Sequence, residues 1–191
     1  IRHVTNTPST NKLDGIFIYM IKLLDNKGTL DDVMKSLLVE LTDKESIKSK
    51  LSNSNIYDFS SNLTKCLLVH IERSLSTKES TKDYWALSTG NEGRSRPVWT
   101  VEHIYPRNPK KGDIDEKCED LKDTLGNLTI TAYNGNLSNR SYAEKLVLER
   151  EGKEIGFNSE NIKINALLKD EVEWKSSNIK NRGHWMVETF L

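Results

Sequence analysis

The amino-acid sequence predicts an α+β fold that is mostly helical and has a small β-rich centre. Three observations support this class. Apolar residues recur at helical spacing through much of residues 1–90. Short β-rich runs with glycine or proline beside them follow between residues 98 and 131. Two further helical stretches close the sequence. We therefore expect a helical region at 1–90 and a second domain at 91–191.

Three helices are expected in the first ninety residues. Gly15–Leu24 is an apolar block of helix length, and the polar run Asp25–Gly28 ends it. Thr29 caps a second helix, whose apolar positions continue at helical spacing to Leu41. A third helix is expected over residues 60–75, with one apolar stripe.

The character of the sequence changes after Thr89, where glycine and proline become frequent. The expected elements are a loop at 90–97, a strand at Val98–Ile104, a polar loop at 106–120, a β-rich run at 125–131, a helix from Ser138 or Ser141 to about Glu151, and helices at 160–174 and 176–190. The centre of this region is thus a strand, a loop, a second strand and a helix.

Composition indicates a cytoplasmic globular protein. The 191 residues carry zero formal net charge, with 29% charged residues, which allows a sizeable core in one large or two small domains. We find neither an apolar run of membrane-spanning length nor a signal-peptide pattern. Cys66 and Cys118 are far apart and in no metal-binding spacing, so we expect reduced thiols. The sequence starts at Ile1, and we expect it to be part of a longer protein.

Positive charge gathers in one segment although the net charge is zero. The basic residues between positions 94 and 111 are Arg94, Arg96, Arg107, Lys110 and Lys111. An acidic stretch follows at 113–123. Zero net charge argues weakly against a nucleic-acid partner, since nucleic-acid-binding domains are often basic. The distribution of charge matters more than its sum, and the segment around Glu102 and His103 is locally basic.

Glu102 and His103 end the expected strand, and Pro106 limits its continuation. A histidine with a pKa near 6.5 can take a proton from water at neutral pH. A carboxylate is a hard oxygen ligand that suits Mg²⁺ or Mn²⁺. Neighbouring strand residues point to opposite faces, so a strand end or bulge must aim both groups at one phosphate. Asn127 and the cluster Asn134–Asn139 add amide groups that either form turns or serve this site.

Three sequence segments together resemble a known family. They are Glu-His-Ile-Tyr-Pro, Leu-Gly-Asn-Leu-Thr-Ile-Thr-Ala-Tyr-Asn and Leu-Ser-Asn-Arg-Ser-Tyr-Ala-Glu-Lys, within residues 98–150. This order is similar to the C-terminal nuclease domain of GmrSD-type modification-dependent (type IV) restriction endonucleases. That domain belongs to the HNH, or ββα-metal, superfamily. The resemblance implies a ββα-metal core among helices and an endonuclease of an anti-phage restriction system.

The resemblance also implies roles by position. His103 matches the general base, and Glu102 matches the acidic metal ligand. Asn127 matches the asparagine that orders the loop and the histidine. Asn134 matches the second metal ligand, whereas counting from Asn127 as in other HNH nucleases selects Asn136 instead. The implied cofactor is Mg²⁺ or Mn²⁺. Lys145 and Arg182 match basic positions of the family that are candidate phosphate contacts.

The resemblance implies DNA as the partner, double-stranded and either modified or not. Full-length relatives carry an N-terminal NTPase and sensor part, which we expect outside this sequence because the sequence lacks its motif and any phosphate-binding glycine loop. A homodimer, RNA as substrate and single-strand nicking all stay open. The main alternative is a nucleic-acid-binding module with an inactive or accessory HNH finger. The intact Glu102, His103, Asn127 and Asn134 argue against it.

Overall fold

The computed structural model describes residues 10–39, 43–89 and 93–191, and the chain divides into two compact units, residues 1–51 and 52–191. Helices combine with two-stranded antiparallel sheets, which confirms the predicted α+β class. The sequence predicts a different kind of division, into a helical region at 1–90 and a nuclease domain at 91–191, and that division stays a prediction. Within the described ranges, no helix combines the length and apolar character needed to cross a membrane.

The first unit contains α2 (Thr10–Asp25) and α3 (Leu30–Val39), and α4 (Lys44–Asn53) lies at its boundary. The predicted end of the first helix is confirmed, because Lys27 has a φ of 63° and the N–H of Gly28 donates to the Leu23 carbonyl at 2.8 Å. Thr29 caps α3 as predicted, since its hydroxyl accepts from the N–H of Asp32 at 3.2 Å. The predicted position Leu41 lies outside the described residues.

The second unit carries the remaining elements. They are α5 (Ile56–Phe59), α6 (Ser61–Leu75), η1 (Lys78–Ser80), β1 (Leu87–Thr89), β2 (Ser95–Pro97), β3 (Thr100–His103), α7 (Glu116–Glu119), η2 (Leu125–Asn127), β4 (Leu128–Thr131), α8 (Asn134–Leu137), α9 (Tyr142–Leu146), β5 (Glu149–Arg150), β6 (Lys153–Glu154), η3 (Lys163–Leu168) and α10 (Ser176–Phe190).

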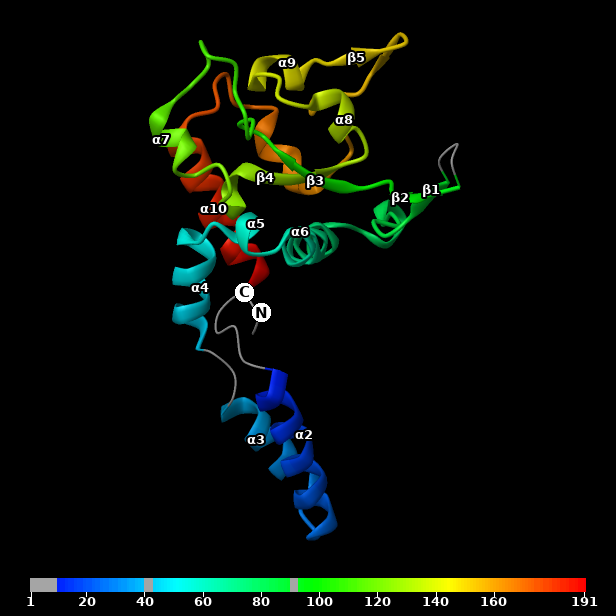
Figure 1. Cartoon of the computed structure of the whole chain (residues 1–191), viewed down its shortest axis with the longest axis vertical. Coiled ribbons are helices and arrows are strands. Elements are labelled where there is room, and N and C mark those ends of the chain that lie inside the picture. The colour runs from blue at the N-terminus through cyan, green and yellow to red at the C-terminus, as the bar shows by residue number, and fades with distance from the viewer. Residues whose placement is uncertain (1–9, 40–42, 90–92) are drawn as a thin grey trace. The chain divides into compact units, whose positions relative to one another are not determined.

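A hairpin of β3 and β4 forms the centre of this unit. The strands pair antiparallel, with Thr100 opposite Thr131 and His103 opposite Leu128. Figure 1 shows α6 on one side of the hairpin and α8 and α9 on the other. Because Glu102 and His103 are consecutive in a regularly paired strand, their side chains point to different faces of the hairpin. The predicted strand is confirmed in type and is shorter than Val98–Ile104.

Helix α10 packs against the η2 turn at very close range, and this explains the glycine before Asn127. A Cβ added to Gly126 would lie 1.9 Å from the Ile179 carbonyl oxygen, so only glycine fits. Arg182 is 2% exposed and donates to the carbonyls of Gly126 at 2.8 Å, Leu128 at 2.9 Å and Ile164 at 3.1 Å. Its suggested phosphate contact is therefore wrong, because the buried guanidinium binds backbone oxygens.

Four expected elements differ from the structure. The loop at 90–97 ends in β2, which pairs with β1, and the polar loop at 106–120 contains α7, capped by the Asp115 side chain. The helix expected to reach Glu151 stops at Leu146, and Glu151 and Gly152, both with positive φ, turn the chain into the β5–β6 hairpin. The helix at 160–174 is only the six-residue 3₁₀ helix η3. The buried Glu72 carboxylate accepts two N–H groups at the start of η3, which fixes this turn through a tertiary contact.

Candidate active site

His103 lies at the end of β3 and is 8% exposed. Its Nε2 is 2.8 Å from Oδ1 of Asp123, which is also buried. The Tyr57 ring meets the imidazole edge-on, with 4.6 Å between ring centres. Burial lowers the pKa of His103, and the Asp123 carboxylate opposes that shift. A neutral imidazole near pH 7, held by a carboxylate through one nitrogen, can accept a proton on the other.

Arg107 lies beside this histidine–aspartate pair. Its guanidinium donates to Asp58 at 2.7 Å, approaches Asp123 to 3.8 Å and lies over the Tyr57 ring at 5.3 Å. The Arg107 side chain is 48% exposed, so it can reach an anion in solution. Part of the basic segment seen in the sequence is thus placed next to His103.

Sequence reasoning missed Asp123 as a site residue. It stands at the end of the acidic stretch 113–123, four residues before Asn127, and 20 residues separate it from His103. The one sequence feature that marks Asp123 is its position just before the Leu-Gly-Asn segment, which carries the site residue Asn127. The contact itself depends on how the loop returns to β4, and no local pattern encodes that return.

Glu102 lies on the other face of the hairpin, in contact with Lys145 of α9. The Lys145 ammonium donates to Oε1 of Glu102 at 2.6 Å and to the His103 carbonyl at 2.5 Å, and the lysine side chain has no exposed area. Burial raises the pKa of Glu102 to about 7 against the opposing effect of Lys145, and burial lowers the pKa of Lys145. The suggested phosphate contact of Lys145 is wrong, because its ammonium is enclosed by the protein.

Further polar groups extend the Glu102 face. Thr131 donates to Glu160, whose other oxygen accepts from Asn165 at 3.0 Å. Asn165 in turn accepts from Thr129, the residue opposite Glu102 in the hairpin. Burial raises the pKa of Glu160 to about 7, and Glu102 adds to the shift. Most of the buried polar groups on this face are therefore satisfied by one another, and one Glu102 oxygen has no described hydrogen bond.

Asn127 is fully buried and uses its amide on both sides of the loop. Its oxygen accepts from the Tyr105 N–H at 2.8 Å and from the Trp174 indole at 3.0 Å. Its nitrogen donates to the carbonyls of Tyr105 at 2.9 Å and Lys122 at 2.8 Å. Asn127 thereby fixes the chain two residues after His103 and one residue before Asp123. It has no described contact with the imidazole itself.

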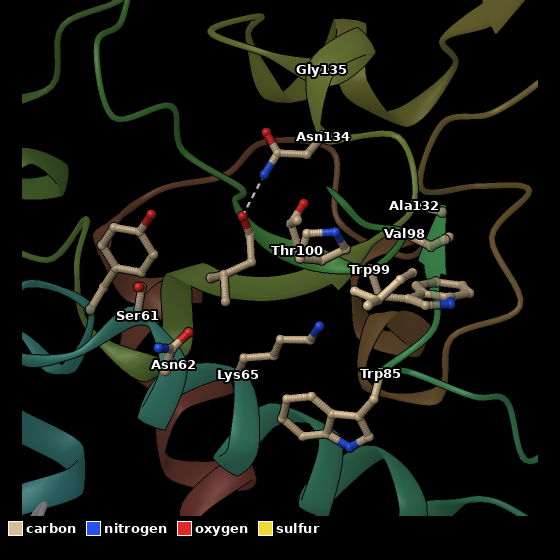
Figure 2. Close-up of a pocket in the computed structure, with 14 residues that line it drawn as sticks. Ser61, Asn62, Lys65, Trp85, Val98, Trp99, Thr100, Ala132, Asn134 and Gly135 are labelled. Carbon is tan, nitrogen blue, oxygen red and sulfur yellow. Dashed lines mark hydrogen bonds between the residues drawn. The ribbon is translucent and has the colours of Figure 1, made fainter. Parts of the chain in front are cut away.

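Asn134 begins α8, and its Nδ2 donates to the Val101 carbonyl of β3 at 2.5 Å. Figure 2 shows the Asn134 amide reaching toward the strand, with its oxygen turned away from that bond. Asn136, the alternative, accepts instead from Arg150 of β5 at 3.4 Å. Of the two asparagines, Asn134 is the one bound to the strand that carries Glu102 and His103.

The donor chemistry of Glu102 and Asn134 fits a magnesium or manganese ion. Lys145 engages one Glu102 oxygen, and within the described structure the second oxygen and the Asn134 oxygen accept no hydrogen bond. Mg²⁺ commonly takes one or two protein oxygens and completes its shell with water and phosphate. An all-protein cage is not available, because the described ranges hold no cluster of three or more His, Cys, Asp or Glu side chains placed for a metal.

A buried histidine–aspartate pair at the end of a β-hairpin, with an arginine beside it, is a site suited to hydrolysis. The model of one family, the C-terminal domain of GmrSD restriction endonucleases, matches residues 41–189. The chain belongs to this family, which confirms the resemblance and places it among restriction-endonuclease-related nuclease domains. No curated protein matches the sequence at a significant level.

Proposed function

We propose that this chain is a divalent-cation-dependent DNA endonuclease domain with a ββα-metal core formed by β3, β4 and α8. The observation that carries the proposal is the 2.8 Å contact between His103 Nε2 and Asp123 in a buried setting. Family membership and the exposed Arg107 beside this pair support DNA as the substrate. We infer the anti-phage role and an N-terminal sensor part from the family resemblance.

His103 acts as the general base in this proposal. With its Nε2 proton donated to Asp123, Nδ1 takes a proton from water while the water oxygen bonds to phosphorus and the bond to the leaving sugar oxygen breaks. Asp123 stabilises the imidazolium that forms. Arg107 contacts a non-bridging phosphate oxygen, and Asn127 keeps His103 and Asp123 in register.

Glu102 and Asn134 would hold the cation. When bound, Mg²⁺ or Mn²⁺ supplies positive charge for the phosphate and the leaving oxygen. The protein's own contribution on this face is the Lys145 ammonium, which keeps the Glu102 carboxylate in place beside the His103 carbonyl.

Plasmid cleavage by the 191-residue chain tests the proposal, with Mg²⁺, Mn²⁺ or EDTA in parallel reactions. We expect cleavage with either cation and none with EDTA. We expect His103→Ala to lower the rate about 10²- to 10⁴-fold, the range of general acid–base catalysis. His184→Ala is the matched control, since His184 is 63% exposed on α10.

Equal rates for His103→Ala and the parent chain would refute the assigned base. A folded parent chain that binds DNA without cutting it under any cation would favour the binding-module alternative. Supercoiled plasmid, linear duplex, single-stranded DNA and RNA compared as substrates would separate nicking, double-strand cleavage and ribonuclease activity.

A further inference from the structure

A cavity of about 680 Å³ lies beside β3, between α6 and the β1–β2 hairpin. This size is within the range of sites that enclose small molecules, about 300–1,000 Å³. Among its 14 lining residues, all in described parts of the chain, none is Asp or Glu. The whole chain has equal numbers of acidic and basic residues, 28 each. A lining without carboxylates therefore departs from the chain average, and it suits an anionic ligand.

Lys65 of α6 supplies the positive charge of this cavity. Only 9% of Lys65 is exposed, and Figure 2 shows its ammonium end directed into the space beside Trp85. The ammonium lies 4.7 Å from the centre of the Trp85 ring and forms no hydrogen bond or ion pair with any described residue. Burial lowers the pKa of Lys65 against the opposing effects of Cys66 and Asp83, and Asp83 makes no ion pair with it. A buried lysine stem with an unpaired head is an arrangement that an external anion completes.

Two tryptophans give the cavity aromatic surfaces. Trp85 is 47% exposed although it is large and apolar, and Trp99 is half-buried. Trp99 is held by Tyr84, with 5.3 Å between ring centres. Exposed indoles beside a cation are the elements with which proteins stack nucleobases and bind the attached phosphate.

The cavity adjoins the candidate active site. Val101 and Asn134 line it, and these two residues are joined by the hydrogen bond described above. Tyr57 also lines it and contacts the His103 ring. Val101 and His103 are two residues apart on one face of β3, a separation of about 7 Å.

We propose that this cavity holds one unstacked nucleotide of the DNA strand, next to the phosphate that His103 attacks. The base stacks on Trp85 and Trp99, and its phosphate binds Lys65. This inference rests on the proposed function, because it assigns the neighbour of the cleaved phosphate.

Binding measured without cleavage tests the inference separately from the nuclease proposal. The protein is the full chain with His103→Ala in EDTA, and the probe is a fluorescein-labelled single-stranded oligonucleotide. We expect Trp85→Ala to weaken binding about 5- to 100-fold, the effect of losing one stacked base. Trp85→Tyr should restore most of the loss. The parent chain should lose tryptophan fluorescence on binding, and Trp85→Ala should lose less.

Lys65→Met keeps the apolar stem and removes the charge. We expect weaker binding, and a slope of log affinity against log salt reduced by about 0.7, the value for one phosphate contact on a single strand. Lys153→Met, at an exposed lysine of β6 outside the cavity, is the matched control and should leave the slope unchanged.

Unchanged affinity in both folded variants, Trp85→Ala and Lys65→Met, would overturn the inference and leave the nuclease proposal standing. Displacement of the oligonucleotide by micromolar thymidine monophosphate would also overturn it, because the cavity would then be a site for free nucleotides. Loss of cleavage in the parent chain with the binding pattern intact would refute only the nuclease proposal.

Discussion

The two faces of the β3–β4 hairpin carry similar polar residues and treat them differently. On the Glu102 face, carboxylates, an ammonium, hydroxyls and an amide are mostly satisfied by one another inside the protein. On the other face, one nitrogen of His103 has no described partner, and Arg107 beside it is half-exposed. Val101, two residues earlier in the strand, lines the cavity.

The Glu102 face combines stabilising contacts with a proposed cation ligand, whereas the His103 face leaves its histidine open to substrate. A closed network contributes rigidity, and breaking it exposes unpaired buried charge. A half-open pair leaves a reactive group available to substrate. Substitutions on the Glu102 face should therefore act first on folding, and those on the His103 face should act on the reaction.

Lys145→Met should give the largest loss of stability. It leaves the Glu102 carboxylate buried without its cation, and breaking one partner of a buried pair costs about 3–5 kcal/mol. Urea denaturation followed by circular dichroism measures the change in free energy of unfolding. The double variant Glu102→Gln/Lys145→Met should recover most of that loss.

Lys110→Met is the control for this prediction. Lys110 forms an ion pair with Glu144 at 3.1 Å, but its side chain is 63% exposed, and such surface pairs contribute about 0–1 kcal/mol. Equal losses in Lys145→Met and Lys110→Met would show that the pair on the Glu102 face does not carry the stability assigned to it.

Asn127 and Asn134 should differ in how much each contributes to the free energy of unfolding. Asn127→Ala removes three buried hydrogen bonds and one partly buried one. It should destabilise the chain by about 2–4 kcal/mol, since unpaired buried groups cost about 1–3 kcal/mol each and water partly replaces the amide. Asn134→Ala removes one bond at a partly exposed position and should cost about 1 kcal/mol or less.

Calorimetric titration with Mn²⁺ then measures which asparagine contributes to cation binding. Asn134→Ala should weaken Mn²⁺ binding, and Asn136→Ala should leave it unchanged. A weaker affinity in Asn136→Ala alone would move the proposed ligand to the register found by counting from Asn127. Similar stability losses in Asn127→Ala and Asn134→Ala would contradict the structural role given to Asn127.

The sequence predicts the parts of this site that local pattern controls. Val98–Ile104 has the composition of a strand, Pro106 restricts its continuation, and the glycine before Asn127 marks a turn. Lys145 and Asp123 are different, because each acts through a partner more than 19 residues away in sequence. Which charge becomes buried depends on how helices and loops return to the hairpin, and no spacing rule reports that.

Short elements were missed for a related reason. The strands β1 and β2 have three residues each, and every one of these residues is exposed, so no alternation of apolar and polar residues marks them. The helix α7, expected as loop, depends on the Asp115 cap. The helix expected at 160–174 is too long, because η3 is fixed by Glu72, which lies about 90 residues earlier in the sequence. Such elements are stabilised by single contacts, and hydrophobic periodicity does not detect them.

Asp123→Asn should change the reaction with little change in stability. The amide still fills the space beside His103 and loses the charge that stabilises the imidazolium. We expect a rate lower by up to about 10⁴-fold, the effect of the equivalent Asp→Asn change in the serine-protease triad, where the histidine is left in the wrong tautomer. The pH dependence of cleavage is the sharper measurement, because it reports the ionisation of His103 directly.

The sign follows from the groups around the imidazole. Burial lowers the pKa of His103 below its ordinary value of 6.5, and Asp123 holds it partly up. The base works when neutral, so the rate falls as pH drops through this pKa. Asp123→Asn removes the upward contribution, and the acidic limb of the profile should move to lower pH. Glu149→Gln, at an exposed carboxylate of β5 with no described contact to His103 or Asp123, should leave the limb in place. A limb that stays fixed in Asp123→Asn would mean that another group takes the proton, and the His103 face would then lose its assigned role.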